Sequence, residues 1–222
     1  MAENSFFDGN EYFNNGKYQE AIESYNGAIA EEGYSFAKLF NLGMAHKYNG
    51  NNGLALLNFE RARHINQSKK VLSQINDIRN KLGIQPDTGL AEYSQPKTIK
   101  LWLALACISF WKAVFFISLI IMTRKFSKIS TVMAGLFAII FTLALVEINK
   151  LTTDGLSAAI VINNGAELLA APVSKSSKIG QVNEGEYVKA SSSKNNFVHI
   201  KSKTGVRGWV KTTDIEPIIP KV

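Results

Sequence analysis

The sequence predicts a multidomain fold that combines α-helical, membrane and β parts: a helical repeat region, a two-helix membrane hairpin and a small C-terminal β-barrel. Three observations predict this fold class. Residues 2–69 contain two similar copies in tandem, because the same offset along the sequence aligns Phe6 with Phe40 and Gly9 with Gly43. Two apolar runs, residues 101–123 and 129–148, are each long enough to span a bilayer. From residue 156 onward, short runs rich in β-branched residues alternate with turn residues.

The repeat pairs residues of matching size in the two copies. Gly9 aligns with Gly43, and Tyr25 aligns with Phe59. The other matched pairs are Gly16 with Gly50, Ala21 with Ala55, and Ala28 with Ala62. We expect the first glycine of each copy inside a helix, where only a hydrogen atom lets the next helix approach. We expect the second glycine at a turn with positive φ. The alanines flank the aromatic residue on one face, as close helix pairing requires.

Over residues 2–69 this pattern resembles two tetratricopeptide repeats (TPR). The matching positions are Gly9, Tyr12, Gly16-Lys17-Tyr18, Ala21, Tyr25 and Ala28. The second copy departs from the family pattern at His46 and Asn52, where aromatic residues are usual. Residues 69–82 are expected to form a further helix that covers the last repeat, so the module extends over residues 2–83.

In the TPR family, the inner face comes from the first helix of each repeat and binds a peptide or a partner helix. The resemblance implies that the partner-binding residues here are Phe6, Asn10, Phe13, Phe40, Met44, Lys47 and Tyr48. Most of them are aromatic or apolar, which favours an apolar or helical partner. The alternative is that several of these aromatics only pack between the repeats or under the last helix.

The membrane hairpin follows a predicted linker at residues 84–100. At about 1.5 Å per residue, each apolar run crosses roughly 30 Å of hydrocarbon. The basic loop between them, residues 124–128, favours the cytoplasmic side, which places both soluble parts in the periplasm. No signal peptide is visible in residues 1–5, so the alternative is that both parts are cytoplasmic if no leader exists.

Lys112 is the one charged residue in the first apolar run. A charge at mid-bilayer costs on the order of 3 kcal/mol, so it needs an explanation. One interpretation is a contact with an acidic group of a partner or a polar pocket inside the protein. The other is that its side chain reaches the membrane surface or pairs with the Thr142 hydroxyl. Cys107, in the same run, is the single cysteine and is interpreted as a small apolar side chain.

Residues 156–217 are predicted to form five or six short strands. Ala159–Ile162 leads into Asn163-Asn164-Gly165, which is typical of a hairpin turn. From Pro172 to Gly208-Trp209-Val210 the sequence resembles the bacterial SH3-like domain, although Phe197 stands where Trp is common. The resemblance implies a small barrel with Tyr187, Phe197 and Trp209 as candidates for a ligand groove. The alternative is that these aromatics belong to the barrel core.

Residues 1–100 contain equal numbers of acidic and basic side chains, so the formal net charge of +7 comes from the rest of the chain. This distribution fits a membrane topology signal better than a nucleic-acid footprint, so no nucleic-acid partner is expected. The three histidines, His46, His64 and His199, have no second ligand at metal spacing. No nucleophile motif or phosphate-binding loop is visible. We therefore predict that the protein is not an enzyme and holds no cofactor or metal.

The order of the parts resembles the BatE proteins of bacterial aerotolerance operons over nearly the whole chain. The resemblance implies a two-pass protein of the bacterial inner membrane. Its partners would be von Willebrand-type (VWA) membrane proteins and a MoxR-type AAA+ ATPase, in assembly or stress tolerance. The expected function is a non-enzymatic protein–protein interaction scaffold. The alternative is a cell-envelope tether or sensor whose SH3-like domain binds peptidoglycan peptides.

Overall fold

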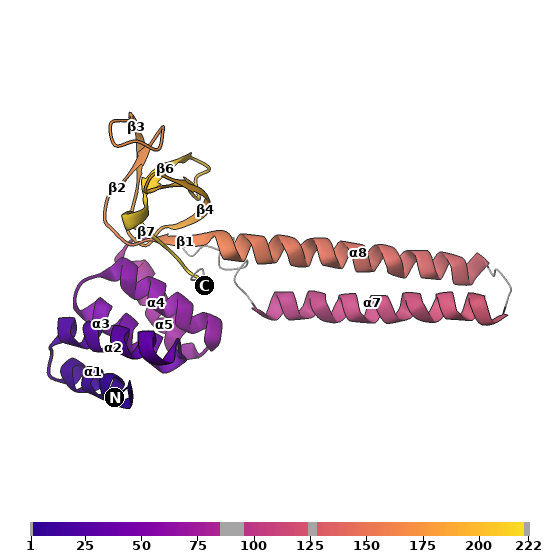
Figure 1. The fold of residues 1–222 in the computed structure, drawn as a ribbon, viewed down its shortest axis with the longest axis horizontal. Helices are drawn as coiled ribbons and strands as arrows, with labels where there is room; N and C mark the ends of the chain where they lie inside the picture. The colour runs from indigo at the N-terminus through magenta and orange to yellow at the C-terminus, as the bar shows by residue number, and fades with distance from the viewer. Residues whose placement is uncertain (1, 85–95, 124–127, 220–222) are drawn as a thin grey trace. The chain divides into compact units, whose positions relative to one another are not determined.

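The computed structural model describes residues 2–84, 96–123 and 128–219 (Figure 1). The chain divides into two compact units. The first unit combines Met1–Leu90 with Leu156–Val222, and the second is Ala91–Gly155. The segments before and after the long apolar helices therefore fold together, although the whole second unit separates them in the sequence.

The first unit begins with two helix pairs and a fifth helix. These helices are α1 (Ala2–Asn14), α2 (Tyr18–Glu32), α3 (Phe36–Tyr48), α4 (Asn52–Ile65) and α5 (Lys69–Lys81). Serine residues cap two of them: the Ser35 hydroxyl accepts from the Lys38 amide and the Ser68 hydroxyl from the Val71 amide, both at 3.3 Å. The predicted helix over residues 69–82 is thus present as α5.

The expectations for the glycines inside helices and for the glycines at turns are both confirmed. A Cβ atom at Gly9 would lie 2.7 Å from the Tyr25 ring, and one at Gly43 would lie 2.8 Å from the Phe59 ring. The turn glycines have φ angles of +74° at Gly16 and +87° at Gly50. The two copies therefore use the same packing device at equivalent positions.

The C-terminal strands form an antiparallel sheet. They are β1 (Ala158–Val161), β2 (Ala166–Leu169), β3 (Lys178–Val182), β4 (Tyr187–Lys194), β5 (Phe197–Lys201), β6 (Arg207–Lys211) and β7 (Ile215–Pro217). Their order is β3-β2-β6-β5-β4-β1-β7, and the short 3-10 helix η1 (Thr212–Asp214) precedes β7. Side chains from all seven strands share one buried cluster, so the sheet curls around its own core.

The prediction of a hairpin turn at Asn163-Asn164-Gly165 is wrong. Gly165 has a φ angle of +71°, but β1 and β2 on either side of it do not pair. β1 pairs with β4 and β7, whereas β2 pairs with β3 and β6. The turn changes the direction of the chain between two distant places in the sheet. Its sequence specifies the bend but not which strand becomes the neighbour.

The second unit contains α7 (Pro96–Thr123) and all but the last two residues of α8 (Lys128–Ser157). Both are longer than the apolar runs that predicted them. Proline is favourable at the first position of a helix because its missing N–H would have no partner there, so α7 begins inside the predicted linker. α8 continues past Ile148 because a polar sequence without proline follows. Residues 85–95 of the predicted linker (84–100) and residues 124–127 of the basic loop (124–128) lie outside the described residues.

The two long helices meet along a seam of small side chains. The buried residues on α7 are Ala106, Ser109 and Ala113, at the alternating spacing of three and four that keeps one face toward a partner. Ring pairs from both helices flank them: Phe110 with Phe141 at 5.6 Å, and Phe116 with Phe137 at 6.0 Å. Small residues let membrane helices approach closely.

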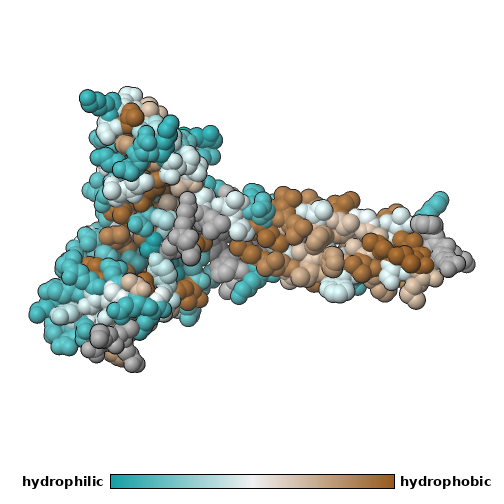
Figure 2. Space-filling view, viewed as in Figure 1, coloured by the Kyte–Doolittle hydropathy of each residue, from teal (hydrophilic) through white to brown (hydrophobic). Residues whose placement is uncertain are grey.

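The outer faces of α7 and α8 are apolar. Two helical stretches, Ile99–Thr123 and Lys128–Thr153, are long and apolar enough to span a membrane. In the most apolar part of each stretch, only 17% is buried. Figure 2 shows this apolar surface along the visible face of both helices. The core helix of a soluble protein would bury most of these side chains. This arrangement therefore suits contact with lipid.

Candidate binding surfaces

The predicted inner face of the repeats is partly committed to contacts inside the protein. Asn10 Oδ1 accepts hydrogen bonds of 2.8 Å from the Tyr25 hydroxyl and from Asn41 Nδ2. Burial raises the pKa of Tyr25 to about 12, so its hydroxyl stays protonated and donates. Phe6 packs on the same tyrosine, with ring centroids 5.8 Å apart. Asn10 and Phe6 thus join α1 to α2 and α3.

Phe40 and Met44 belong to the packing of the second repeat. Phe40 is 5% exposed and packs against the Phe59 ring at 5.4 Å. The ammonium group of Lys70 on α5 lies 4.5 Å from the centre of the Phe40 ring. Met44 is partly buried against the same cluster. At Phe40, the alternative that an aromatic packs under the last helix describes the structure better.

Lys47 connects α3 to α5. Its ammonium group donates to Gln74 Oε1 at 2.7 Å and forms an ion pair with Asp77. The hydrogen bond from Lys47 is the main reason why the pKa of Asp77 is lowered. Because Asp77 is largely exposed, this ion pair is screened by solvent and leaves Lys47 accessible to a competing carboxylate.

Tyr48 offers the most open aromatic surface of the predicted face. Its side chain is 56% exposed. It stacks on Tyr18 at 5.3 Å and meets Phe13 edge-on at 5.6 Å. These three rings form an aromatic cluster beside the turn at Gly16. Through the exposed ring of Tyr48, this cluster can pack against an apolar side chain of a partner.

Tyr187 does not line an open groove. It is 5% exposed, and its hydroxyl donates to Oε1 of Glu60 on α4. Arg79 of α5 donates to the same carboxylate oxygen at 3.1 Å and to the Tyr187 hydroxyl at 2.6 Å. On the other carboxylate oxygen, Arg63 Nε donates at 2.6 Å. The groove interpretation of Tyr187 is therefore replaced by a polar network that joins β4 to the repeat helices.

Electrostatics explain why this network holds together. Glu60 is completely buried, and two guanidinium groups supply the opposite charge. Burial is the main reason that the pKa of Tyr187 lies well above its usual value, and the nearby Glu60 charge raises it further. Tyr187 therefore remains a hydrogen-bond donor at any physiological pH.

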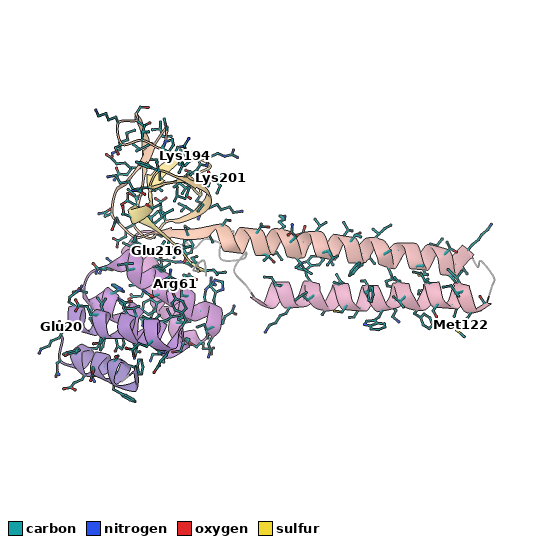
Figure 3. All side chains as sticks on the ribbon, viewed as in Figure 1. Glu20, Arg61, Met122, Lys194, Lys201 and Glu216 are labelled. Atoms are coloured by element: carbon teal, nitrogen blue, oxygen red, sulfur yellow. The ribbon has the colours of Figure 1, made fainter. Side chains whose placement is uncertain are left out.

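Further polar contacts join the repeat helices to the sheet. Arg61 on α4 donates to Glu216 on β7 at 3.1 Å and to the carbonyl of Pro217 at 2.8 Å; Figure 3 labels Arg61 and Glu216. The amide of Gly53 donates to Glu184 Oε1 at 2.6 Å. A Cβ atom at Gly53 would lie 2.8 Å from the Ile162 Cα atom, so backbones from the two parts meet closely here.

A polar pocket of about 300 Å³ lies at one end of the sheet. It is lined by Ser174, Asn195, Asn196, Phe197, Lys211, Thr212 and Thr213. Asn195 and Asn196 form the β4–β5 turn with φ angles of 50° and 63°. The Asn196 carbonyl accepts from the amide and the hydroxyl of Thr212, at 2.9 and 3.0 Å. The turn is thus fixed to η1, and amide, hydroxyl and ammonium groups surround the pocket.

Of the other two groove candidates, the structure brings only Phe197 to this pocket. Phe197 is 6% exposed, so it forms the pocket floor more than an open platform. Trp209 is partly buried and packs edge-on against His199 at 5.2 Å. Sequence reasoning missed the rest of the pocket. The pair Asn195-Asn196 was a usable signal for the turn beside the pocket, because asparagine tolerates positive φ in tight turns.

Lys112, the predicted intramembrane polar residue, is exposed on α7. The Thr142 hydroxyl instead donates to the Ile139 carbonyl at 2.8 Å, and no bond joins the two side chains. The proposed Lys112–Thr142 pair is therefore absent from the described helices. A group of three or more His, Cys, Asp or Glu residues arranged for a metal is likewise absent from the described residues.

Comparison with known families identifies one part of the chain. Residues 164–216 match the family model of the bacterial SH3 domain. The match covers β2 to β6 and all of β7 except Pro217, and it contains the pocket-lining residues, so the SH3-like interpretation of the C-terminal part is confirmed over this range. No curated protein matches the chain.

Proposed function

We propose that the chain is a non-enzymatic interaction scaffold, held in a bacterial inner membrane by α7 and α8. One observation carries the proposal. The repeat helices before the hairpin and the SH3-like sheet after it bond directly to each other through Glu60, Arg79 and Tyr187. Such contacts require both parts on one side of the bilayer, and a pair of spans returns the chain to that side.

The scaffold would present two surfaces to partners. The aromatic cluster of Phe13, Tyr18 and Tyr48 suits an apolar or helical segment, and the polar pocket suits an extended polar ligand. The order of parts resembles BatE proteins, which supports VWA-domain membrane proteins and a MoxR-type ATPase as partners, with a role in aerotolerance. The basic loop favours the periplasm for both parts.

Site-specific labelling tests the shared side of the membrane. Asn26→Cys and Lys194→Cys, each in a Cys107→Ala background, place one thiol on the repeats and one on the sheet; both native side chains are exposed. In intact cells, a membrane-impermeant maleimide should label both variants or neither. Labelling of one and protection of the other until the cells are permeabilised would contradict the proposed topology.

Co-purification tests the scaffold role. The full chain in mild detergent should retain a co-expressed VWA-domain membrane protein, and Tyr48→Ala should weaken this retention. Glu20→Ala, on the exposed face of α2, is the control and should retain it fully. Equal retention by the Tyr48 variant would remove the aromatic cluster from the proposal.

The second candidate function is a tether that binds peptidoglycan peptides. The match to the bacterial SH3 domain and the amide, hydroxyl and ammonium groups of the polar pocket favour it. The full chain should then sediment with purified cell-wall sacculi, and Lys211→Ala should reduce the bound fraction. Lys201→Ala, on the neighbouring strand β5, is the matched control. Absence of sedimentation would leave the scaffold as the better account.

A further inference from the structure

Lys112 lies too deep in the apolar stretch to reach the membrane surface. The stretch runs from Ile99 to Thr123, so Lys112 lies close to its middle. At about 1.5 Å per residue, the Thr123 end is about 16 Å away and the Ile99 end about 20 Å away. An extended lysine side chain reaches only about 6 Å along the apolar surface before its charged end. Snorkelling therefore leaves the amine in hydrocarbon.

The described parts of α7 and α8 offer Lys112 no partner. No hydrogen bond or ion pair to its Nζ atom exists among them. Glu147 is the acidic residue of the predicted second span, and it lies 3.9 Å from Lys150. A lysine at mid-bilayer without a partner is unfavourable enough that such residues normally pair or face a polar cavity.

Lys112 belongs to a distinct face of α7. Together with Ile108, Trp111, Phe115 and Cys107 it surrounds a shallow hollow of about 440 Å³. At about 100° per residue, the middle of this face lies roughly 160° around the helix from the seam of small residues that contacts α8. Its large side chains are open: Ile108 is 59%, Trp111 70% and Phe115 58% exposed. α8 therefore leaves this face available to another helix.

We propose that this face docks a transmembrane helix of a different membrane protein, one that carries Asp or Glu at mid-bilayer. The proposal rests on the proposed membrane anchoring. Charge complementarity selects the occupant, because a carboxylate at the depth of Lys112 offsets the cost of burying both groups in hydrocarbon. The hollow between Trp111 and Phe115 gives the backbone of that helix room to approach.

A second copy of the chain does not supply this carboxylate. Measured from Lys128, the start of α8, Glu147 lies about 28 Å from the loop end of the hairpin. Lys112 lies about 16 Å from the same end. Two copies inserted in the same direction would present these groups about 12 Å apart in depth. The occupant is therefore a helix of another protein.

A synthetic transmembrane helix tests the proposal. The probe is a Leu/Ala peptide of about 23 residues with one central Glu, and the matched probes carry Gln or Leu at that position. The full chain, with a fluorophore at its N-terminus, is reconstituted in phosphatidylcholine vesicles, and energy transfer to an acceptor on the peptide is measured. Flotation of the vesicles establishes insertion first, so a chain that fails to float counts against the anchoring proposal.

Given insertion, the wild-type chain should bind the Glu peptide roughly tenfold better than the Leu peptide, as expected for one polar contact between membrane helices. Lys112→Leu should abolish this preference and Lys112→Arg should keep it. Lys100→Leu, at the end of the same helix, should leave it unchanged. Equal binding of the Glu and Leu peptides, or an unchanged preference in Lys112→Leu, would overturn the proposal. So would self-association of the chain that disappears in Lys112→Leu, since a second copy would then be the occupant.

Discussion

The two repeat copies share their interior and differ in their surroundings. Tyr25 in the first copy and Phe59 in the second sit against a glycine in the same way. One position later, however, Asn26 is exposed while Glu60 is completely buried. The outer side of α4 is covered by the SH3-like sheet, and the matching side of α2 faces solvent. Equivalent positions of a repeat therefore carry different physical demands.

The comparison shows what a repeat period can and cannot specify. Contacts within a helix pair recur in each copy because the same two helices meet with the same geometry. The network around Glu60 instead involves Tyr187, which lies 127 residues further along the chain. It depends on where the sheet docks. Four predictions test this difference, and their expected effects decrease in the order given.

The largest effect is expected for Glu60→Ala. It removes the carboxylate that Arg63, Arg79 and Tyr187 share, and breaking a buried ion pair in this way costs about 3–5 kcal/mol of unfolding free energy. The matched change in the first copy, Asn26→Ala, should stay within about 0.5 kcal/mol. Urea unfolding in detergent measures both, with Trp102 and Trp111 replaced by Phe so that Trp209 reports on the sheet. Equal costs would show that the two positions are equivalent after all.

The next effect is a pH dependence specific to the second copy. Burial lowers the pKa of His46 to about 4, whereas an unfolded histidine titrates near 6.5. Below pH 6.5 the unfolded chain takes up this proton first, so stability should fall between about pH 6.5 and 4, by about 3 kcal/mol in total. His64, whose pKa is also lowered, acts in the same direction.

Unfolding curves at several pH values check this slope. His46→Gln should flatten it, leaving the part due to His64. Tyr12 occupies the matching position of the first copy, so Tyr12→Gln should leave the slope as it is. A wild-type chain that keeps constant stability between pH 6.5 and 4.5 would contradict the buried, neutral state of His46.

A smaller effect tests the packing that the copies share. Gly43→Ala should destabilise by about 1–3 kcal/mol, because the new methyl group would overlap the Phe59 ring. Gly9→Ala should cost a similar amount against Tyr25. Gly27→Ala meets no neighbour within 4 Å and should stabilise by about 0.5–1 kcal/mol through helix propensity alone. Thermal unfolding gives all three values, and a loss of stability at Gly27 would indicate a contact there.

The smallest effect is expected at the exposed link between α3 and α5. Lys47→Ala should cost less than about 1 kcal/mol, because a solvent-screened ion pair contributes little. The difference from wild type should shrink further in 0.5 M salt. The matching residue of the first copy, Phe13, has no charge, so Phe13→Leu should show no salt dependence. A Lys47 effect that persists at high salt would indicate packing by its aliphatic stem instead.

Much of the fold could be predicted because it depends on short-range patterns. The glycine contacts, the turns with positive φ and α5, which covers the last repeat, follow from local spacing in the sequence. The long helices follow from continuous apolar runs. The site was harder. Tyr187 reads as a groove residue in an isolated strand, and only its docking against α4 makes it a buried donor. Asn163-Asn164-Gly165 reads as a hairpin turn because the bend is local, while the pairing of β1 with β4 and β7 is not.

Periodicity and apolar length alone thus specify two helix pairs, two span-length helices and a β-rich end. Each of these segments forms through its own backbone hydrogen bonds or by packing against the segment next to it. The tertiary structure decided which surfaces remain available to partners. It buries Tyr187 and Phe40, leaves Tyr48 open, and gathers Asn196 and Lys211 around one pocket. The physical reason is that burial is a property of the whole packed chain: a side chain is covered only when a segment distant in sequence folds over it.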